Sequence, residues 1–444
     1  MRLEKKFFND FGKVMKKNKA VKGVKDVLPQ ESQLWGLFEG RAKDYFGRYG
    51  FDEIRIPIFE RTDVFSRGLG GTTDIVEKEM YTFKDRGGES LTLRPEGTAS
   101  VVRAFVEHKL FYPPGVIKLF YMGPMFRCER PQAGRYRQFY QVGAELFGTQ
   151  SAHADAETIG MLMEFLGNFR LKNLTLHLNT LGCPICRPGF RDELVAFVRG
   201  RIDSFCANCV SRYERNPLRI FDCKSAGCKV ATEDAPLVTG FLCSNCEIHF
   251  SEVKKHLKIQ DVSFTLSPRL VRGLDYYTRT AFEITAQGLG SQNAIAGGGR
   301  YDQLVEELGG PATPAFGFAL GVERVLALID GAEFSEGATG LFVVSLGEPA
   351  KELALKIGFE LRRLGFRVEQ DYENGGLKSQ MKKANRCGAR FCLILGENEI
   401  EAKSIVFRDM KTGTQENIAL GRVTGEVAGR LNALRNSSTL EKPG

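Results

Sequence analysis

Apolar positions near the N-terminus repeat first with the period of a helix and then with that of a strand. Between Ser32 and Tyr49 they recur every three or four residues, at Leu34, Trp35, Phe38, Ala42, Tyr45 and Phe46. Gly50 ends this predicted helix, and a strand over 51–59 follows with Pro57 inside it. Because proline has no amide donor, we expect that strand to lie at a sheet edge or an interface.

The stretch from Gly123 to Gly148 alternates apolar and polar side chains in two segments, which predicts a hairpin. Its strands are expected around Met125–Glu129 and Tyr136–Phe147, joined by a turn at residues 131–134. Aromatic residues interleave there with Arg127, Glu129, Arg135, Arg137, Gln141 and Glu145. A solvated hairpin with cross-strand ion pairs explains any two of these charges. The whole set favours a polyanionic or polar ligand.

Two further segments place polar side chains beside predicted strands. Over 89–103 a strand runs into Arg94-Pro95-Glu96-Gly97-Thr98, and a helix begins near Thr98 or Ala99. A carboxylate at such a turn suits an ammonium ligand, while a glutamate that complements the helix dipole is the common alternative. Over 270–283 the peptide Arg272-Gly-Leu-Asp275-Tyr276-Tyr277 lies between strand-like flanks. Its side chains can form a planar polar pocket, or belong to a strand with aromatic residues.

Residues 296–302 contain three consecutive glycines, which permit close approach of a ligand to the backbone. No Gly-Lys-Ser/Thr follows them, so any bound ATP is not held by a P-loop. Residues 315–329 predict a strand that enters an apolar helix, with Arg324 near the junction. An arginine near the start of a buried helix requires an anion.

The pattern changes after a linker at 329–340 that is rich in Gly, Asp, Glu and Ala. Strands are predicted at 341–346, 366–372, 390–396 and 404–410, and helices at 349–364 and 377–387. This alternation predicts a small α/β domain with a largely parallel sheet. Along its second helix recur Lys378, Lys382, Lys383 and Arg386. These form either a solvated face or a contact for RNA.

Charge and composition add limited information. The 444 residues are 43% hydrophobic and 26% charged, as in ordinary globular proteins, and carry a net charge of +8. Residues 1–22 hold eight Lys or Arg against Glu4 and Asp10, so the remainder carries only about two positive charges. No apolar run approaches the roughly 20 residues of a membrane span. We therefore expect a cytoplasmic protein whose residues 1–20 form a basic extension, by default a solvated tail.

Eight of the eleven cysteines lie between Cys183 and Cys246, mostly as C-x-x-C. They are Cys183, Cys186, Cys206, Cys209, Cys223, Cys228, Cys243 and Cys246. Such pairs present two sulfurs to one tetrahedral ion, so we predict structural zinc, in one or two sites. The simplest arrangement joins the first two pairs in one site and the last two in another. His249 could replace a sulfur, but we expect it to be an unligated surface residue.

The charged hairpin, the peptide RGLDYYT and the strand with Arg324 together resemble the histidyl-tRNA synthetases of the class II aminoacyl-tRNA synthetases. The resemblance covers roughly residues 22–330. It implies an α+β and α/β multidomain fold, in which an antiparallel-sheet catalytic domain (21–334) carries a Cys-rich insertion (about 180–260). A linker (335–341), a small α/β anticodon-binding domain (342–432) and a polar tail (433–444) would follow. The class motifs fall at about 32–60 (motif 1, the dimer interface), 118–148 (motif 2), 270–283 (the histidine motif) and 312–329 (motif 3).

For ATP, which would arrive with Mg²⁺, the resemblance implies contacts from the arginines. Arg127 would meet the α-phosphate and the substrate carboxylate, Arg135 the outer phosphates, and Arg324 the γ-phosphate. Glu129 and Phe139 would hold adenine. Arg272 would stand by the α-phosphate in place of a metal ion, a role that suits a guanidinium better than an ammonium group.

For histidine, the resemblance implies that Glu145 and Tyr277, with Tyr276 nearby, read the imidazole. Glu96, Thr98 and Gln141 would contact the α-amino group. The partners implied are tRNA(His), L-histidine, ATP and a second copy of the chain. Relatives of this kind carry few cysteines in the insertion, so the zinc prediction comes from the cysteine spacing alone.

Three alternatives stay open from the sequence. A histidyl-synthetase-like regulatory subunit of ATP phosphoribosyltransferase shares the catalytic fold without aminoacylation, but typically lacks the arginine at 272 and the C-terminal domain. A zinc-dependent nucleic-acid-binding module would explain the cysteines but not the arginine-rich hairpin. Synthetases for Gly, Thr or Pro would share motifs 2 and 3 but not RGLDYYT.

Overall fold

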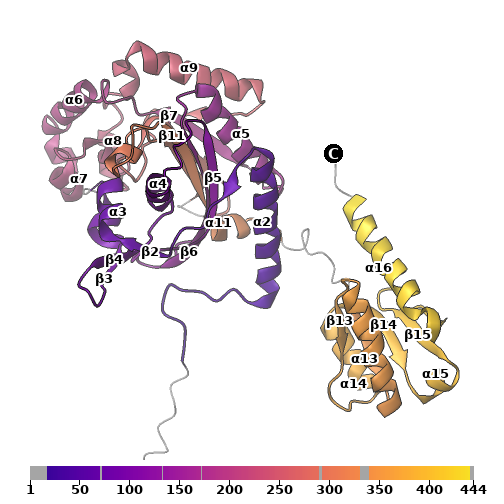
Figure 1. Cartoon of the computed structure of the whole chain (residues 1–444). Coiled ribbons are helices and arrows are strands. Elements are labelled where there is room, and N and C mark those ends of the chain that lie inside the picture. Colours follow the sequence, from indigo (N-terminus) through magenta and orange to yellow (C-terminus); the bar gives the residue numbers. More distant parts are fainter. Residues whose placement is uncertain are drawn as a thin grey trace, which may run out of the picture. The chain divides into compact units, whose positions relative to one another are not determined.

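A computed structural model describes residues 18–70, 73–132, 134–171, 173–289, 293–330 and 340–440. The chain divides into two compact units, Met1–Ile329 and Asp330–Gly444. Both units are drawn in Figure 1. Nearly all of the predicted extension 1–20, most of the linker 335–341 and the last four residues of the predicted tail lie outside the described residues. None of the helices described is long and apolar enough to cross a membrane.

The first unit is built on an eight-stranded sheet, mostly antiparallel, with parallel pairs at its two ends. In spatial order its strands are β1 (Asp52–Glu53), β5 (Ile117–Phe126), β6 (Gln138–Phe147), β11 (Ala315–Gly321), β10 (Ala294–Arg300), β9 (Thr278–Thr285), β7 (Thr175–Thr180) and β8 (Thr265–Leu266). The predicted antiparallel-sheet catalytic domain is therefore confirmed.

The hairpin lies at β5 and β6, but its first strand was predicted too late in the chain. β5 ends at Phe126 and β6 begins at Gln138, and the described residues 127–132 and 134–137 belong to the connection between them. Backbone donors in this loop bind other segments: Cys128 N donates to Glu79 O and Arg137 N to Gly23 O. Arg127, Glu129, Arg135 and Arg137 therefore lie outside the two strands, whereas Gln141 and Glu145 lie within β6.

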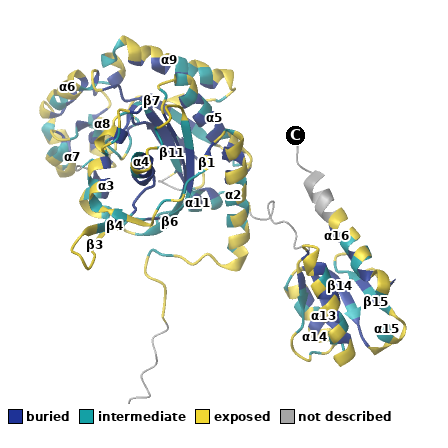
Figure 2. Ribbon diagram, in the orientation of Figure 1, coloured by how far each residue is buried: buried dark blue, intermediate teal, exposed yellow. Residues whose placement is uncertain are grey.

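Helices cover both faces of this sheet (Figures 1 and 2). On one face α2 (Pro29–Arg48) and α5 (Ala152–Gly167) pack against it, and the ring of Phe46 contacts Phe120, Phe165 and Phe318. On the other face lies α4 (Thr98–Glu107), where Phe105 stacks on Phe147 at 4.3 Å. Because strand side chains alternate, Phe120 and its neighbour Tyr121 serve opposite faces.

The strand predicted over 51–59 is two short strands. β1 holds the edge of the large sheet, and β2 (Phe59–Arg61) begins a three-stranded sheet with β4 (Ser90–Leu93) and β3 (Tyr81–Lys84). Pro57 lies between them, where the missing amide donor costs no ladder bond. The buried guanidinium of Arg94 binds the carbonyls of Ile56 and Pro57 and holds this crossing in place. α3 (Thr62–Gly68) follows.

The Cys-rich insertion is entirely helical in its described secondary structure. It contains α6 (Arg187–Arg199), α7 (Ala207–Arg212) and α8 (Ala226–Ala231), with 3-10 turns at Ile202–Ser204, Pro217–Ile220 and Val238–Phe241. α9 (Ser244–Ile259) leads back to the sheet and packs along α5.

The second unit holds a five-stranded sheet in the order β13 (Val368–Gln370), β12 (Gly340–Ser345), β14 (Ala389–Leu395), β15 (Ser404–Asp409), β16 (Gln415–Ala419). Helices α13 (Glu348–Arg363) and α14 (Leu377–Arg386) provide parallel crossovers. The last two strand pairs are antiparallel, so "largely parallel" was wrong for half of the sheet. β15 and β16 are joined by a turn too short for a crossover. The predicted polar tail is helical through Leu440, at the end of α16 (Val423–Leu440).

Candidate active site

The α4 face of the large sheet gathers the polar residues that the sequence singled out. Along β6 the side chains of Phe139, Gln141 and Glu145 are separated by even numbers of residues and share this face. α4 begins at Thr98, and Thr98 Oγ1 donates to Glu145 Oε1 at 2.7 Å. Residues from two distant parts of the chain therefore meet on this face.

Glu145 is the centre of this group and is completely buried. The hydroxyl of Tyr301 donates a short hydrogen bond to Glu145 Oε2. Burial raises the pKa of the Glu145 carboxyl to about 8, although hydrogen bonds from Thr98 and Tyr301 oppose the rise. Tyr301 was missed in the sequence, where it stands directly after the glycine-rich strand.

Two glycines make room for this group. A Cβ at Gly317 would lie 1.8 Å from Glu145 Oε2, and one at Gly143 would lie 2.3 Å from the Tyr121 ring. A Cβ at Gly297 would lie 2.4 Å from Arg272 Nη2. The glycine run therefore admits a guanidinium of the chain itself, whereas the sequence had suggested close approach of a ligand.

Glu96 is buried at the start of α4, where it accepts from the backbone N–H of Thr98 at 2.7 Å and of Ala99 at 2.8 Å. This is the helix-dipole role named above as the alternative. Each carboxylate oxygen retains a second lone pair, so the contact does not preclude an ammonium ligand. Gln141 Oε1 is buried with no hydrogen-bond partner among the described residues.

The histidine motif is mainly a loop, because β9 begins only at Thr278. Tyr276 and Tyr277 are buried, with ring centroids 4.6 Å apart, and Tyr276 lies 5.5 Å from Tyr301. Arg272 Nη1 donates to Glu283 Oε2 at 2.7 Å, and its Nε is buried without a partner in the described structure. Glu283, on β9, is a second site residue that the sequence reasoning missed.

The predicted phosphate-binding arginines lie beside this group of residues. Arg127 Nε donates to the carbonyl of Pro95 at 2.9 Å, and its guanidinium lies 5.2 Å from the Phe139 ring centroid. Arg135 Nη1 donates to Glu129 Oε2 at 2.6 Å. Phe139 and Glu129, the expected adenine contacts, are thus engaged by arginines in this structure.

Arg324 lies on the short helix α11 (Val322–Leu326) and closes the arginine group. Its Nε donates to Gly134 O at 3.0 Å and its Nη1 to Ala294 O at 2.6 Å. Burial lowers the pKa of Arg324, and the positive charges of Arg135 and Arg127 lower it further. Converging positive charges that lower the pKa of Arg324 favour a polyanion at this position.

The eight cysteines form two quartets, but with a different pairing from the one predicted. The outer quartet is Cys183, Cys186, Cys243 and Cys246, and the inner quartet is Cys206, Cys209, Cys223 and Cys228. The first pair therefore joins the last. The reason is that an insertion leaves and re-enters its parent domain at neighbouring points, so its end pairs meet at the base.

Sulfur separations test whether zinc fits. Cys183 and Cys186 sulfurs are 3.5 Å apart, Cys183 and Cys243 3.9 Å, and Cys206 and Cys223 3.7 Å. A tetrahedral zinc with Zn–S bonds of about 2.3 Å sets its sulfurs about 3.8 Å apart. Disulfide sulfurs are only about 2.05 Å apart. The donors thus fit a metal.

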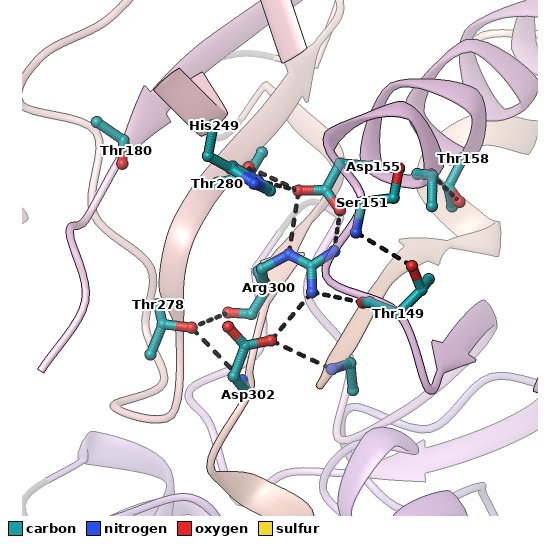
Figure 3. Close-up of polar contacts among 12 residues, drawn as sticks. Thr149, Ser151, Asp155, Thr158, Thr180, His249, Thr278, Thr280, Arg300 and Asp302 are labelled. Carbon is teal, nitrogen blue, oxygen red and sulfur yellow. Dashed lines mark hydrogen bonds and ion pairs between the residues drawn. The ribbon is translucent and has the colours of Figure 1, made fainter. Parts of the chain in front are cut away.

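His249 does not belong to either quartet, and it is buried, so the expected surface position was wrong. Its Nε2 lies 2.9 Å from Asp155 Oδ2 and 3.2 Å from Thr280 Oγ1. Figure 3 shows that Asp155 in turn holds the guanidinium of Arg300. This cluster joins α5, α9, β9 and β10 beneath the site.

The raised pKa of Glu145 makes a stability prediction. Between the ordinary value of 4.5 and about 8, the folded chain keeps a proton that the unfolded chain has released. Raising the pH through this window therefore costs the wild type about 1.4 kcal/mol of unfolding free energy per pH unit from this group. Glu145→Gln removes that cost. The difference in Tm, wild type minus variant, should shrink from pH 5 to 8, and parallel Tm curves would contradict this.

Comparison with known proteins agrees with the geometry. A family model described as "Histidyl-tRNA synthetase" matches residues 23–183 and 243–325, and one described as "Anticodon binding domain" matches residues 341–430. The histidine--tRNA ligase of Geobacter sulfurreducens is 49% identical over 93% of this chain and 99% of its own. That of Moorella thermoacetica is 51% identical over 90% and 96%.

Among solved structures, apo histidyl-tRNA synthetase from S. aureus superposes with a TM-score of 0.79 at 38% identity, covering 93% of this chain and all of its own. A Bacillus halodurans protein titled as an ATP phosphoribosyltransferase regulatory subunit/histidyl-tRNA synthetase has a TM-score of 0.63 at 18% identity, covering 85% of this chain and 97% of its own, and shares the fold. The sequence identity over nearly the full length and the match of both domains lead to one conclusion: the chain belongs to the histidyl-tRNA synthetase family.

Proposed function

We propose that the chain is an ATP-dependent ligase that joins L-histidine to tRNA(His). The observation that carries this is the buried Glu145, held by Thr98 and Tyr301, beside a group of arginines on the same sheet face. A cationic or N–H-donating side chain favours the ionised form of the buried Glu145 carboxyl and can bind to it, and the arginines can bind a triphosphate. The two substrates of histidine activation would thus lie side by side.

In the first step, a histidine carboxylate oxygen attacks the α-phosphorus of ATP, and pyrophosphate leaves with the electrons of the broken P–O bond. Negative charge builds on the α-phosphate, so cations positioned there stabilise the transition state. We assign Arg127 and Arg272 to this position, Arg135 to the outer phosphates and Arg324 to the γ-phosphate. Mg²⁺ would enter with ATP and neutralise phosphate charge.

Adenine would be held by Glu129 and by stacking on Phe139. Both side chains already contact an arginine, Glu129 through Arg135 and Phe139 through Arg127, so adenine would bind to side chains that other residues hold in position.

In the second step, a hydroxyl at the 3′ end of tRNA attacks the acyl carbon and AMP leaves. Substrate binding would require Arg135 to divide its hydrogen bonds between Glu129 and phosphate.

The imidazole would be read from two sides. Glu145 would accept from one ring nitrogen, while the hydroxyl of Tyr277, with Tyr276 beside it, would meet the other. A pocket built on buried polar pairing strongly rejects analogues that leave a group unpaired. Gln141, whose Oε1 has no partner among the described residues, would join Glu96 and Thr98 at the α-amino group.

We assign structural zinc to each cysteine quartet. The sulfur separations given above support this assignment.

Eleven cysteines without disulfides are typical of a reducing compartment, so we place the protein in the cytoplasm. We assign residues 21–334 to catalysis and 342–432 to the anticodon. Exposed Ile58, Phe59 and Phe83, near the predicted motif 1, support a homodimer interface.

ATP–pyrophosphate exchange with each of the twenty amino acids tests the function. We expect exchange with histidine alone, followed by charging of tRNA(His) only. Folded protein that exchanges with no amino acid would instead favour the non-catalytic regulatory role. Exchange with glycine, threonine or proline would move the assignment to another synthetase specificity.

A further inference from the structure

The loop that carries Arg272, Tyr276 and Tyr277 has little regular structure of its own. It spans residues 271–277, between a turn and the start of β9. Its side chains must nevertheless be held within a fraction of an ångström for catalysis, because misplacement of about 1 Å can cost 10²-fold in rate. We call residues 271–277 the histidine loop, and another part of the chain must hold it in position.

The contacts point to the Cys-rich insertion. Arg219 Nη2 donates to the carbonyl of Gly273 at 2.6 Å, and Asn216 Nδ2 donates to Asp275 Oδ1 at 2.7 Å. Arg187 donates to the carbonyl of Tyr277 through a short hydrogen bond and to that of Leu181 at 3.3 Å. Two guanidinium groups of the insertion therefore bind the backbone of the histidine loop near both of its ends.

These contacts bridge a space that packing leaves unfilled. A cavity of about 240 Å³ lies between the insertion and the histidine loop, lined among others by Arg187, Arg219, Arg272, Asp275 and Tyr277. Arg219 is itself buried, so its hydrogen bonds form away from most solvent. Where apolar packing is incomplete, directed hydrogen bonds fix the backbone.

Both arginines are tied to the cysteine quartets by the chain. Arg187 directly follows Cys186 of the outer quartet. Arg219 stands in the 3-10 turn Pro217–Ile220, between Cys209 and Cys223 of the inner quartet. The insertion has only a small core of its own, and units of this size usually need a metal or disulfides to fold.

We propose that the zinc-loaded insertion positions the histidine loop, with Arg187 and Arg219 as the positioning residues. The proposal rests on the histidine activation proposed above. The family match breaks off at residue 183 and resumes at residue 243. The support for the loop therefore comes from a part of the chain that the family model does not cover.

The arginine test uses the full-length chain in histidine-dependent ATP–pyrophosphate exchange. Arg219→Ala should raise KM for histidine about tenfold, as expected for loss of a charged hydrogen bond, with KM for ATP changed less than about twofold. Arg219→Lys, which restores one donor, should recover part of the loss. Arg199→Ala is the matched control, since Arg199 lies exposed on α6 and pairs with the exposed Glu214.

An unchanged KM for histidine in Arg219→Ala and Arg187→Ala would overturn the proposal. So would an equal loss for both substrates accompanied by a fall in Tm, since that indicates general damage. Absence of exchange in the wild type would reject the proposed function itself, so the two failures are distinguishable.

The metal test counts zinc by elemental analysis. We expect two zinc ions per wild-type chain. The double variant Cys206→Ser/Cys223→Ser should keep one ion, whereas Cys186→Ser/Cys209→Ser, which affects both quartets, should lose both. Retention of one ion in the second variant would overturn the ligand partition. The one-zinc variant should also show the raised KM for histidine. An unchanged KM would mean that this zinc ion does not help to position the histidine loop, which would overturn that part of the proposal.

Discussion

Arg272→Ala is expected to lower kcat of histidine-dependent ATP–pyrophosphate exchange by about 10²–10³-fold, the usual cost of one charge-stabilising donor. Arg272 Nη1 is paired with Glu283 Oε2, but its Nε is buried without a described partner. A guanidinium with a buried N–H that has no hydrogen-bond partner is available to donate to an anion. Single-turnover formation of histidyl-adenylate measures the chemical step directly.

Three observations separate this from a folding defect. The Tm of Arg272→Ala should stay within a few degrees of the wild type, because the one side-chain hydrogen bond of Arg272 among the described residues is to the partly exposed Glu283. The kcat of Arg272→Lys should lie between those of the wild type and Arg272→Ala, since an ammonium group keeps the charge but loses the planar fork of donors. An unchanged rate in Arg272→Ala would remove this residue from catalysis.

Local periodicity made much of the fold predictable. The helix at α2 and the strand-to-helix step at β11 and α11 follow from apolar spacing alone. The alternation of side chains along β6 likewise puts Phe139, Gln141 and Glu145 on one face of the sheet. Each of these features depends on residues that are neighbours in the chain.

The cysteine pairing could not be read in the same way. C-x-x-C spacing shows that two sulfurs can share an ion, but not which second pair completes the site. Cys183 and Cys243 are 60 residues apart and meet because the insertion closes at its base. Tyr301 and Glu145, 156 residues apart, meet because β6 and β10 both border β11. Contacts at such separations are set by topology.

His249 was placed wrongly for the same reason. A histidine on a helix of mixed polarity looks exposed, but Asp155, 94 residues earlier, forms its partner. Asp155 and Arg300 are both completely buried (Figure 3). Arg300 Nη2 donates to Asp155 Oδ1 at 2.5 Å, and Nε donates to Oδ2 at 3.2 Å.

Asp155→Ala should therefore destabilise the first unit by about 3–5 kcal/mol, because it leaves the buried cation of Arg300 without its main partner. Thermal unfolding followed by circular dichroism would show this as a lower Tm of the transition of that unit. Asp302→Ala is the matched control: Asp302 bonds the same guanidinium at 3.0 Å but is partly exposed, so water can replace it at smaller cost. Equal losses in the two variants would contradict the argument.

The double variant Asp155→Leu/Arg300→Met tests whether the buried ion pair only stabilises the fold or also positions Tyr301. Replacing both members of a buried ion pair by apolar residues of similar volume is often neutral, so most of the lost Tm should return. Arg300 directly precedes Tyr301, whose hydroxyl binds Glu145 in the proposed histidine pocket. If the cluster only stabilises the fold, the double variant should have the wild-type KM for histidine. If the ion pair also sets the position of Tyr301, KM for histidine should be raised in the restabilised protein.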